Sequence, residues 1–272
     1  MLKISNGLSR RTLLRVLGFI PLAAFGSRLS ATPEVRLHRA IPASGETIPA
    51  IGMGSWITFN VGGNAHARAV RVEVLRTFFE AGGALIDSSP MYGSSEMVIG
   101  DCLKRLGNPS RLFSATKVWT WGRPMGIRQM ENSQRLWGAE RFDLMQIHNL
   151  LDWETHLETL EQWKAEGRIR YLGITTSHGR RHEELEMLLR TRPLDFVQFT
   201  YNVLDREAER RLLPLAADRG VAVIINRPFQ GGALFDRVAR HELPAWSREF
   251  GCTNWAQFLL KFIVAHAAVT CA

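Results

Sequence analysis

Short apolar runs alternate with segments of helical periodicity along most of the chain. The runs are continuous rather than alternating apolar and polar, which is typical of strands buried on both faces, and such strands are usually parallel. The predicted strands are residues 51–56, 84–87, 112–117, 142–147, 169–174, 196–198, 221–225 and 269–271.

Amphipathic segments between these runs predict helices. They cover residues 70–79, 153–166, 206–219 and 255–266, and a further helix begins after residue 93. Ser94 or Ser95 is expected to cap that helix, with the acidic Glu96 in its first turn. Seven strand–helix units and the start of an eighth strand predict a (β/α)8 TIM barrel, for which about 250 residues is typical. A doubly wound open sheet is the alternative, but no Gly-x-Gly-x-x-Gly follows the first strand.

Composition and charge narrow the function classes. The chain has 272 residues, of which 46% are hydrophobic and 22% charged, so it can bury a sizeable core. The net charge is +8, but residues 1–31 contribute +5, which leaves 8 − 5 = +3 for the remainder. That remainder has no basic run, and we therefore expect no nucleic-acid partner.

The N-terminus resembles an export signal. Residues 9–14 read Ser-Arg-Arg-Thr-Leu-Leu, a twin-arginine pattern, and the apolar stretch at 16–25 is too short for a confident membrane span. We predict a twin-arginine signal peptide at 1–31 and a barrel domain at 32–272. The expected partner is the twin-arginine export machinery, the expected location is the bacterial periplasm, and no stable membrane span is expected after processing. The alternative is a basic amphipathic N-terminal helix.

The cysteines do not indicate a metal site. Cys102, Cys252 and Cys271 form no closely spaced pair, and their number is odd. They match neither a disulfide framework nor a zinc-ligand pattern.

Polar side chains follow six of the predicted strands. In a barrel these carboxyl ends converge on one mouth, where the active site lies. The residues are Asp87, Lys117, His148, Thr175, Gln198 and Arg227. Taken singly, Asp87 and Lys117 fit a buried ion pair and His148 a core histidine, but six such positions together favour an active site.

Tyr92 lies in the loop after the second strand and is a candidate proton donor. A free tyrosine has a pKa of about 10, and a lysine ammonium such as Lys117 beside it favours the phenolate and lowers that pKa. Asp87 would hold the lysine charged, and His148 would orient a carbonyl group or share the proton relay. These groups suit the reduction of a carbonyl group to an alcohol. None of them supplies a hydride, so this reaction requires a cofactor.

Together these residues resemble the tetrad of the aldo-keto reductase superfamily. The resemblance rests on Gly-Met-Gly-Ser-Trp at 52–56, Asp-Ser-Ser-Pro-Met-Tyr-Gly-Ser-Ser-Glu at 87–96, Thr-Lys-Val at 116–118, Gln-Ile-His at 146–148, Leu-Gly-Ile-Thr-Thr at 172–176 and Val-Gln at 197–198. It implies hydride transfer between NADP(H) and a small-molecule carbonyl substrate, with NAD(H) not excluded.

The resemblance also implies residue roles. Tyr92 would be the acid/base, Lys117 and Asp87 its tuning pair, and His148 the orienting group. Cofactor-binding positions would be Ser55, Trp56, Thr175, Thr176, Gln198, Asn226 and Arg227, with Gln198 holding the carboxamide.

Several positions depart from the family pattern. Thr175-Thr176 replaces the usual Ser-Asn, and Asn226 stands where a tyrosine often stacks on the nicotinamide. Arg227 fits three roles equally: contact with a phosphate, contact with a substrate carboxylate, or an ion pair at the rim. Trp119 and Trp121 fit either a wall for an apolar substrate or packing on the rim.

The C-terminus is the largest departure. Family members continue beyond Val-Thr-Cys into a segment that binds the 2′-phosphate, whereas the sequence ends at Ala272. We expect strand 8 to be barely begun and the closing helix to be missing. The sequence therefore does not indicate whether NADP or NAD is the preferred cofactor. The leading hypothesis is an exported reductase; the alternative is a cofactor-binding redox sensor or partner subunit on the same barrel.

Overall fold

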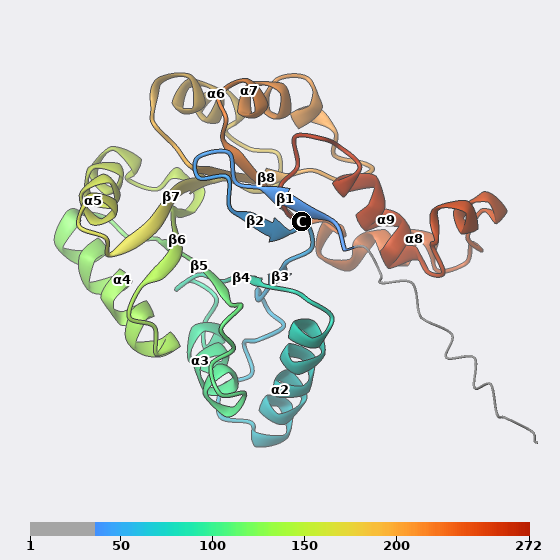
Figure 1. Cartoon of the computed structure of the whole chain (residues 1–272), viewed down its shortest axis with the longest axis horizontal. Helices are drawn as coiled ribbons and strands as arrows, with labels where there is room; N and C mark the ends of the chain where they lie inside the picture. The colour runs from blue at the N-terminus through green and yellow to red at the C-terminus, as the bar shows by residue number, and fades with distance from the viewer. Residues whose placement is uncertain (1–35) are drawn as a thin grey trace, which may run out of the picture. The chain divides into compact units, whose positions relative to one another are not determined.

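A seven-stranded parallel sheet curls around the centre of the protein, as the computed structural model of residues 36–272 shows (Figure 1). Neighbouring strands in space are also neighbours in sequence, and every pair is parallel. The strands are β3 (Met53–Gly54), β4 (Leu85–Asp87), β5 (Phe113–Val118), β6 (Phe142–Ile147), β7 (Ile169–Thr175), β8 (Phe196–Thr200) and β9 (Ala222–Asn226). This arrangement confirms the predicted barrel and excludes the doubly wound sheet, whose strand order reverses.

Most of the helices lie around the outside of this sheet, and α8 lies to one side (Figure 1). They are α2 (Ala65–Glu80), α3 (Ser95–Arg105), α4 (Arg123–Trp137), α5 (Trp153–Ala165), α6 (His182–Thr191), α7 (Leu212–Asp218), α8 (Ala233–Val238) and α9 (Trp255–Val264), with the 3-10 turns η1 (His148–Leu150), η2 (Glu207–Glu209), η3 (Gln230–Gly232) and η4 (Ala245–Phe250).

The helix predicted at 206–219 is divided into η2 and α7. Pro214 explains the division, because proline has no N–H and its ring clashes with the carbonyl four residues earlier. A helix can hold Pro214 only in its first turn, and α7 begins at Leu212 accordingly.

The last two residues occupy the eighth strand position. Cys271 forms an isolated parallel bridge with Ile224, and its carbonyl accepts a hydrogen bond from the N–H of Ile225 (2.8 Å). On the other side, the N–H of Gly52 donates to the carbonyl of Ala272 (2.9 Å), and Ala272 donates to Ala50 (3.0 Å). The expectation of a barely begun strand 8 is confirmed, and this short segment links β9 to the chain just before β3.

A hairpin closes the amino-terminal end of the barrel. Strands β1 (His38–Ala40) and β2 (Thr47–Pro49) pair antiparallel, and Ile48 in β2 and Ile41 after β1 are buried in the cluster inside the barrel. Because this end is filled by apolar side chains, polar groups inside the barrel lie toward its other end.

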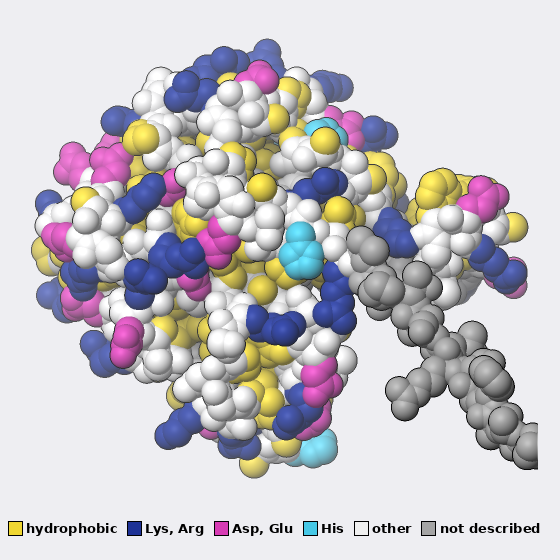
Figure 2. Space-filling model, in the orientation of Figure 1, with side chains coloured by type: hydrophobic (Ala, Val, Ile, Leu, Met, Phe, Trp, Pro, Cys, Tyr) yellow, Lys and Arg dark blue, Asp and Glu magenta, His cyan; other side chains and the backbone are white. Residues whose placement is uncertain are grey.

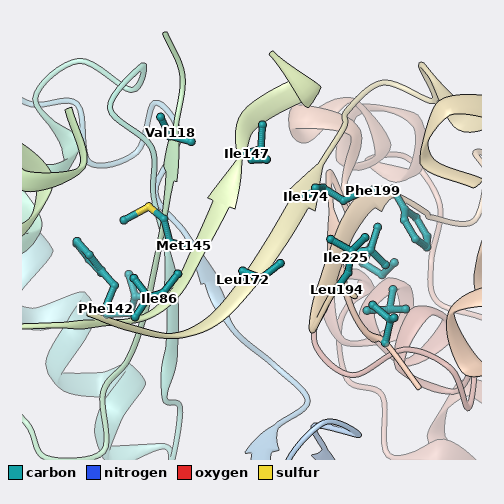
Figure 3. Close-up of a cluster of buried hydrophobic side chains, with 14 of the residues drawn as sticks. Ile86, Val118, Phe142, Met145, Ile147, Leu172, Ile174, Leu194, Phe199 and Ile225 are labelled. Carbon is teal, nitrogen blue, oxygen red and sulfur yellow. The ribbon is translucent and has the colours of Figure 1, made fainter. Parts of the chain in front are cut away.

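Alternation along the strands decides which side chains enter the barrel. Leu85 and Leu144 belong to the inner cluster, whereas Ile86 and Met145 belong to the cluster between sheet and helices (Figure 3). Successive side chains point to opposite faces, so residues two positions apart share a face. Asp87, two residues after Leu85, therefore points into the barrel mouth.

Charges of both signs are mixed on the face of the protein shown in Figure 2. Lys and Arg side chains are spread over several elements and interspersed with Asp and Glu on the face shown in Figure 2. Among the helices of residues 36–272, none has the length and apolar character needed to cross a membrane. The predicted signal peptide at 1–31 lies outside the described residues.

Candidate active site

Asp87 and Lys117 form the floor of the barrel mouth. The Lys117 ammonium lies 2.5 Å from Oδ2 of Asp87 and also donates to the carbonyl of Ser88 (2.7 Å). The lysine is fully buried, while the Asp87 side chain is 13% exposed. Burial lowers the pKa of Lys117, but Asp87, Tyr92 and Glu96 together raise it, and the net pKa lies above its ordinary value. Lys117 is therefore a buried ammonium that is charged at neutral pH.

Gln146 is the third residue of this floor, and it was not among the residues predicted from the sequence. Its Nε2 donates to Oδ1 of Asp87 (2.9 Å), and it is the register partner of Lys117 across β5 and β6. The available signal was a buried polar residue inside an apolar strand, two positions before His148 and so on the same face.

Tyr92 lies above the ammonium and beside the histidine. Its ring centroid is 5.4 Å from Nζ of Lys117 and 5.7 Å from the His148 ring, to which it is nearly perpendicular at 88°. Burial raises the pKa of the Tyr92 phenol, and although Lys117 lowers it, the net pKa lies above its ordinary value. The predicted lowering is therefore wrong in its net direction, because desolvation penalises the phenolate more than one ammonium favours it. The phenol is protonated at neutral pH.

His148 is oriented by a hydroxyl that sequence reasoning did not single out. Ser89 Oγ lies 2.8 Å from Nδ1 of His148, and the same oxygen accepts a hydrogen bond from the N–H of Met91 (3.3 Å). The Ser89 proton is then available to Nδ1, which favours the tautomer with the imidazole proton on Nε2. Burial, together with the Lys117 charge, lowers the pKa of His148 to about 3. The ring is therefore uncharged at neutral pH.

The loop that carries Tyr92 is held differently from the prediction. Ser94 precedes α3, but its side chain makes no cap hydrogen bond. Its hydroxyl instead donates to Oδ1 of Asn60 (2.9 Å) and accepts from the N–H of Gly62 (2.8 Å).

Glu96 in the first turn of α3 is buried rather than solvated. It accepts from the hydroxyls of Thr116 (2.6 Å) and Ser133 (2.9 Å) and from the Trp137 indole (3.3 Å). Burial raises the pKa of this carboxyl above its ordinary value, although the hydrogen bonds from the three donors lower it. Because Thr116 precedes Lys117, this network connects the Tyr92 loop to the strand that carries the lysine.

A second polar group lies at the ends of β7, β8 and β9. Asn226 donates to the carbonyl of Thr176 (2.7 Å) and to Oε1 of Gln198 (3.4 Å), and its Oδ1 accepts from the hydroxyl of Thr200 (2.7 Å). The Thr176 hydroxyl is buried without a hydrogen-bond partner in residues 36–272. Thr175 is the register partner of Gln198, and its hydroxyl accepts from the N–H of Asn149 (3.2 Å). Thr200 is the member that the sequence did not indicate.

Ser55, Trp56 and Arg227 are the remaining predicted residues. Ser55 is buried and donates to Ser88 Oγ (2.8 Å), which places it beside Asp87 at the floor of the mouth. Trp56 is 48% exposed and lies near Gly231 in the loop after β9. Arg227 has a positive φ of 54°, and its guanidinium forms no ion pair with any carboxylate of the described chain. The rim ion pair considered for Arg227 is not observed.

The three cysteines are separate and buried. Between residues 36 and 272, no group of three or more His, Cys, Asp or Glu side chains is arranged to hold a metal ion.

Comparisons with known proteins agree on one family. The sequence model of the Aldo/keto reductase family matches residues 50–267, which is most of the chain. Methylglyoxal reductase YeaE of Escherichia coli is 28% identical over 240 residues, covering 85% of this chain and 83% of the relative. Aldo-keto reductase YhdN of Bacillus subtilis is 26% identical over 216 residues, covering 74% of this chain; the chain spans 64% of that relative, just under two thirds.

A solved structure shows the same architecture. The aldo/keto reductase of Klebsiella pneumoniae, crystallised with NADP and acetate, superposes with a TM-score of 0.71 at 28% identity, covering 84% of this chain and 81% of that protein.

Proposed function

The chain belongs to the aldo/keto reductase family, and we propose that it reduces an aldehyde or ketone to an alcohol with a nicotinamide cofactor. The observation that carries this proposal is the meeting of Tyr92, Lys117 and His148 at the carboxyl ends of neighbouring barrel strands. The naming of the Escherichia coli relative as a methylglyoxal reductase supports the same reaction class.

Tyr92 is the proposed proton donor. Its raised pKa keeps the phenol protonated at neutral pH, so a proton is available for the oxygen of the reduced carbonyl. The Lys117 ammonium, 5.4 Å from the ring centroid, stabilises the phenolate that the transfer leaves behind. Asp87 holds the ammonium in place through its 2.5 Å contact.

His148 is proposed to orient the substrate. As a neutral ring with its proton on Nε2, it donates a hydrogen bond to a carbonyl oxygen without adding a charge to the site. This keeps Tyr92 as the group that transfers the proton.

The polar group at the ends of β7 to β9 fits a carboxamide. The unpartnered Thr176 hydroxyl and the Gln198 amide together offer a donor and an acceptor, as a nicotinamide carboxamide requires. A bound cofactor supplies the hydride that these side chains lack. NADP(H) is the proposed cofactor, since the Klebsiella relative was crystallised with NADP, and NADH is tested beside it.

We further propose that residues 1–31 are a twin-arginine signal peptide and that the mature barrel, residues 32–272, acts in the bacterial periplasm. The Ser-Arg-Arg-Thr-Leu-Leu pattern supports this proposal. In cell fractionation, the full chain should reach the periplasm, and a variant carrying Arg10→Lys and Arg11→Lys should stay in the cytoplasm. Equal distribution of the two would refute the export proposal.

The test of the activity is oxidation of NADPH or NADH in the presence of a panel of aldehydes and ketones. Tyr92→Phe should abolish turnover and leave cofactor binding intact, since only the phenolic proton donor is lost. Tyr171→Phe is the matched control: it loses a hydroxyl at the opposite end of the barrel, where Tyr171 donates to Ser44 (2.7 Å). Tight cofactor binding without turnover in the unaltered chain would sink the proposal and favour a sensor.

A further inference from the structure

The segment that directly follows His148 has a strained backbone. Nine non-glycine residues between positions 36 and 272 have a positive φ, and three of them lie in this segment: Asn149 (54°), Leu150 (53°) and Asp152 (50°). The left-handed region costs free energy for residues other than glycine, and a bulky side chain such as that of Leu150 rarely adopts it. Such a conformation persists only where the surrounding contacts impose it.

Packing and two hydrogen bonds hold part of this segment. The Leu150 side chain is 1% exposed and belongs to the cluster between sheet and helices. The N–H of Asn149 donates to the hydroxyl of Thr175 at the end of β7 (3.2 Å), and the N–H of Leu151 donates to the carbonyl of His148 (3.2 Å). These contacts do not involve the carbonyl of Asn149 or that of Leu150.

Arg181 binds both of these carbonyls. Its Nη1 donates to the carbonyl of Asn149 (2.6 Å) and to that of Leu150 (3.1 Å). The φ and ψ angles of Leu150 lie between the two peptide groups that carry these oxygens. In extended backbone successive carbonyls point in opposite directions, so one donor reaches both only when the residue between them has helical dihedral angles. The contact of Arg181 therefore acts directly on the strained residue.

Glu184 in α6 fixes the guanidinium that makes these contacts. Its Oε2 accepts from Nε of Arg181 and its Oε1 from Nη2, both at 2.6 Å. This paired contact sets the plane of the guanidinium and leaves Nη1 directed at the carbonyls. Because the Arg181 side chain is 41% exposed, the ion pair itself adds little stability, and its effect lies in the geometry.

We propose that Arg181 is a positioning residue that imposes the left-handed turn at residues 149 and 150 and thereby fixes the place of the His148 imidazole. The chain leaves β6 at Ile147 and turns at once, so the direction of His148 depends on the turn that follows it. Arg181 acts through the backbone and touches none of the reacting groups. The inference rests on the proposed function, because His148 is the proposed carbonyl-orienting group.

The test compares Arg181→Met with Arg190→Met. Both variants replace an arginine whose guanidinium binds a glutamate of α6, but Arg190 binds Glu186 (2.8 Å) and makes no hydrogen bond to residues 149–152. Methionine retains an unbranched side chain and has no donor. Arg181→Lys keeps a charged donor for the carbonyls without the paired contact to the glutamate, so it should restore part of the loss.

We expect Arg181→Met to lower kcat about five- to tenfold, which is less than the roughly 100-fold loss that an ångström of misplacement can cause. The substrate is methylglyoxal or, where it is not reduced, the panel compound that the unaltered chain reduces fastest. KM for NADPH should not change, because the polar group at the ends of β7 to β9 is not altered. Arg190→Met should behave as the unaltered chain.

NMR of protein with isotope-labelled histidine reports the position of the His148 ring without turnover. A ring held in one tautomer gives two well-separated nitrogen shifts, whereas interchange between the tautomers averages them. We expect separated shifts in the unaltered chain and in Arg190→Met, and shifts that approach each other in Arg181→Met. The spectrum of His148→Gln identifies the signals, and Arg181→Lys provides the same comparison where Arg181→Met does not fold.

Three results would overturn the inference: unchanged His148 shifts in Arg181→Met, an unchanged kcat in that variant, or an equal loss of kcat in Arg190→Met. A fall in kcat with unchanged shifts counts among them, because the loss would then not pass through His148. Absence of turnover with every carbonyl compound of the panel would instead refute the proposed function. The NMR comparison would still decide whether Arg181 holds His148.

Discussion

The hydroxyl of Ser89 lies 2.8 Å from Nδ1 of His148, although the two residues are 59 positions apart in the chain. Ser89 Oγ also accepts a backbone hydrogen bond from Met91, and its own proton is available to the imidazole. This contact favours the proposed Nε2–H tautomer, and it links the loop after β4 to the end of β6.

Ser89→Ala should therefore reduce activity without unfolding the protein. Without the hydroxyl, neither the tautomer nor the ring orientation of His148 is fixed. We therefore expect kcat/KM to fall about tenfold, which is less than the contribution of a group that itself transfers the proton. Ser44→Ala, at the opposite end of the barrel, serves as the control. Steady-state kinetics with an unchanged kcat/KM in Ser89→Ala would contradict the assignment of the tautomer.

His148 should also make stability depend on pH. Its folded pKa of about 3 lies below the ordinary 6.5, so between these values the unfolded chain binds a proton that the folded chain does not. Stability is then lost as pH falls below about 6.5, by at most about 1.4 kcal/mol per pH unit, and His148 contributes no dependence above that pH.

Urea unfolding at about pH 7.5 and about pH 5 can test this dependence. His148→Asn does not titrate, so it should lose less stability than the unaltered chain, by about 2 kcal/mol. Equal losses in the two proteins would show that the folded His148 is not held neutral.

The ion pair between Lys117 and Asp87 should be costly to break from one side. Lys117→Met leaves the Asp87 carboxylate without its ammonium, and we expect a loss of about 3–5 kcal/mol in the free energy of unfolding. The double variant with Asp87→Asn should lose less than the sum of the single variants, because no uncompensated charge is left. Denaturant unfolding of the unaltered chain, the two single variants and the double variant gives the coupling free energy between the two side chains. Strictly additive losses of unfolding free energy would argue against a direct interaction.

Gly100 should tolerate no side chain. A Cβ at this position of α3 would lie 1.9 Å from the carbonyl oxygen of Leu136 in α4, a backbone atom that cannot move alone. We expect Gly100→Ala to destabilise the protein by about 3 kcal/mol or more, at the upper end of overpacking costs. Gly63→Ala, where no atom lies within 4 Å, is the matched control in thermal unfolding. Similar unfolding temperatures for the two variants would contradict the close approach of the helices.

The barrel was predictable because its signal is local. Continuous apolar runs and helical periodicity located β4 to β9 and the positions of α2, α5 and α9 within a few residues. Convergence of the polar strand ends followed from the general geometry of barrels, and the structure brings Asp87, Lys117 and His148 together at the mouth.

Other features of the site were not predictable, because they depend on distant partners. The contact of Gln146 with Asp87 and the contact of Ser89 with His148 join elements that only the packing of the strands brings together. The Ser94 side chain shows the same limit, since its hydroxyl oxygen accepts from the N–H of Gly62 and not from the helix N–H groups that it was expected to cap.

By itself, then, the sequence determined the order of the barrel strands and the residue types at the mouth. The tertiary structure decided their protonation and orientation. Burial raises the pKa of Tyr92 although Lys117 beside it acts in the opposite direction, because desolvation depends on every atom packed around the phenol and not on its neighbours in the chain.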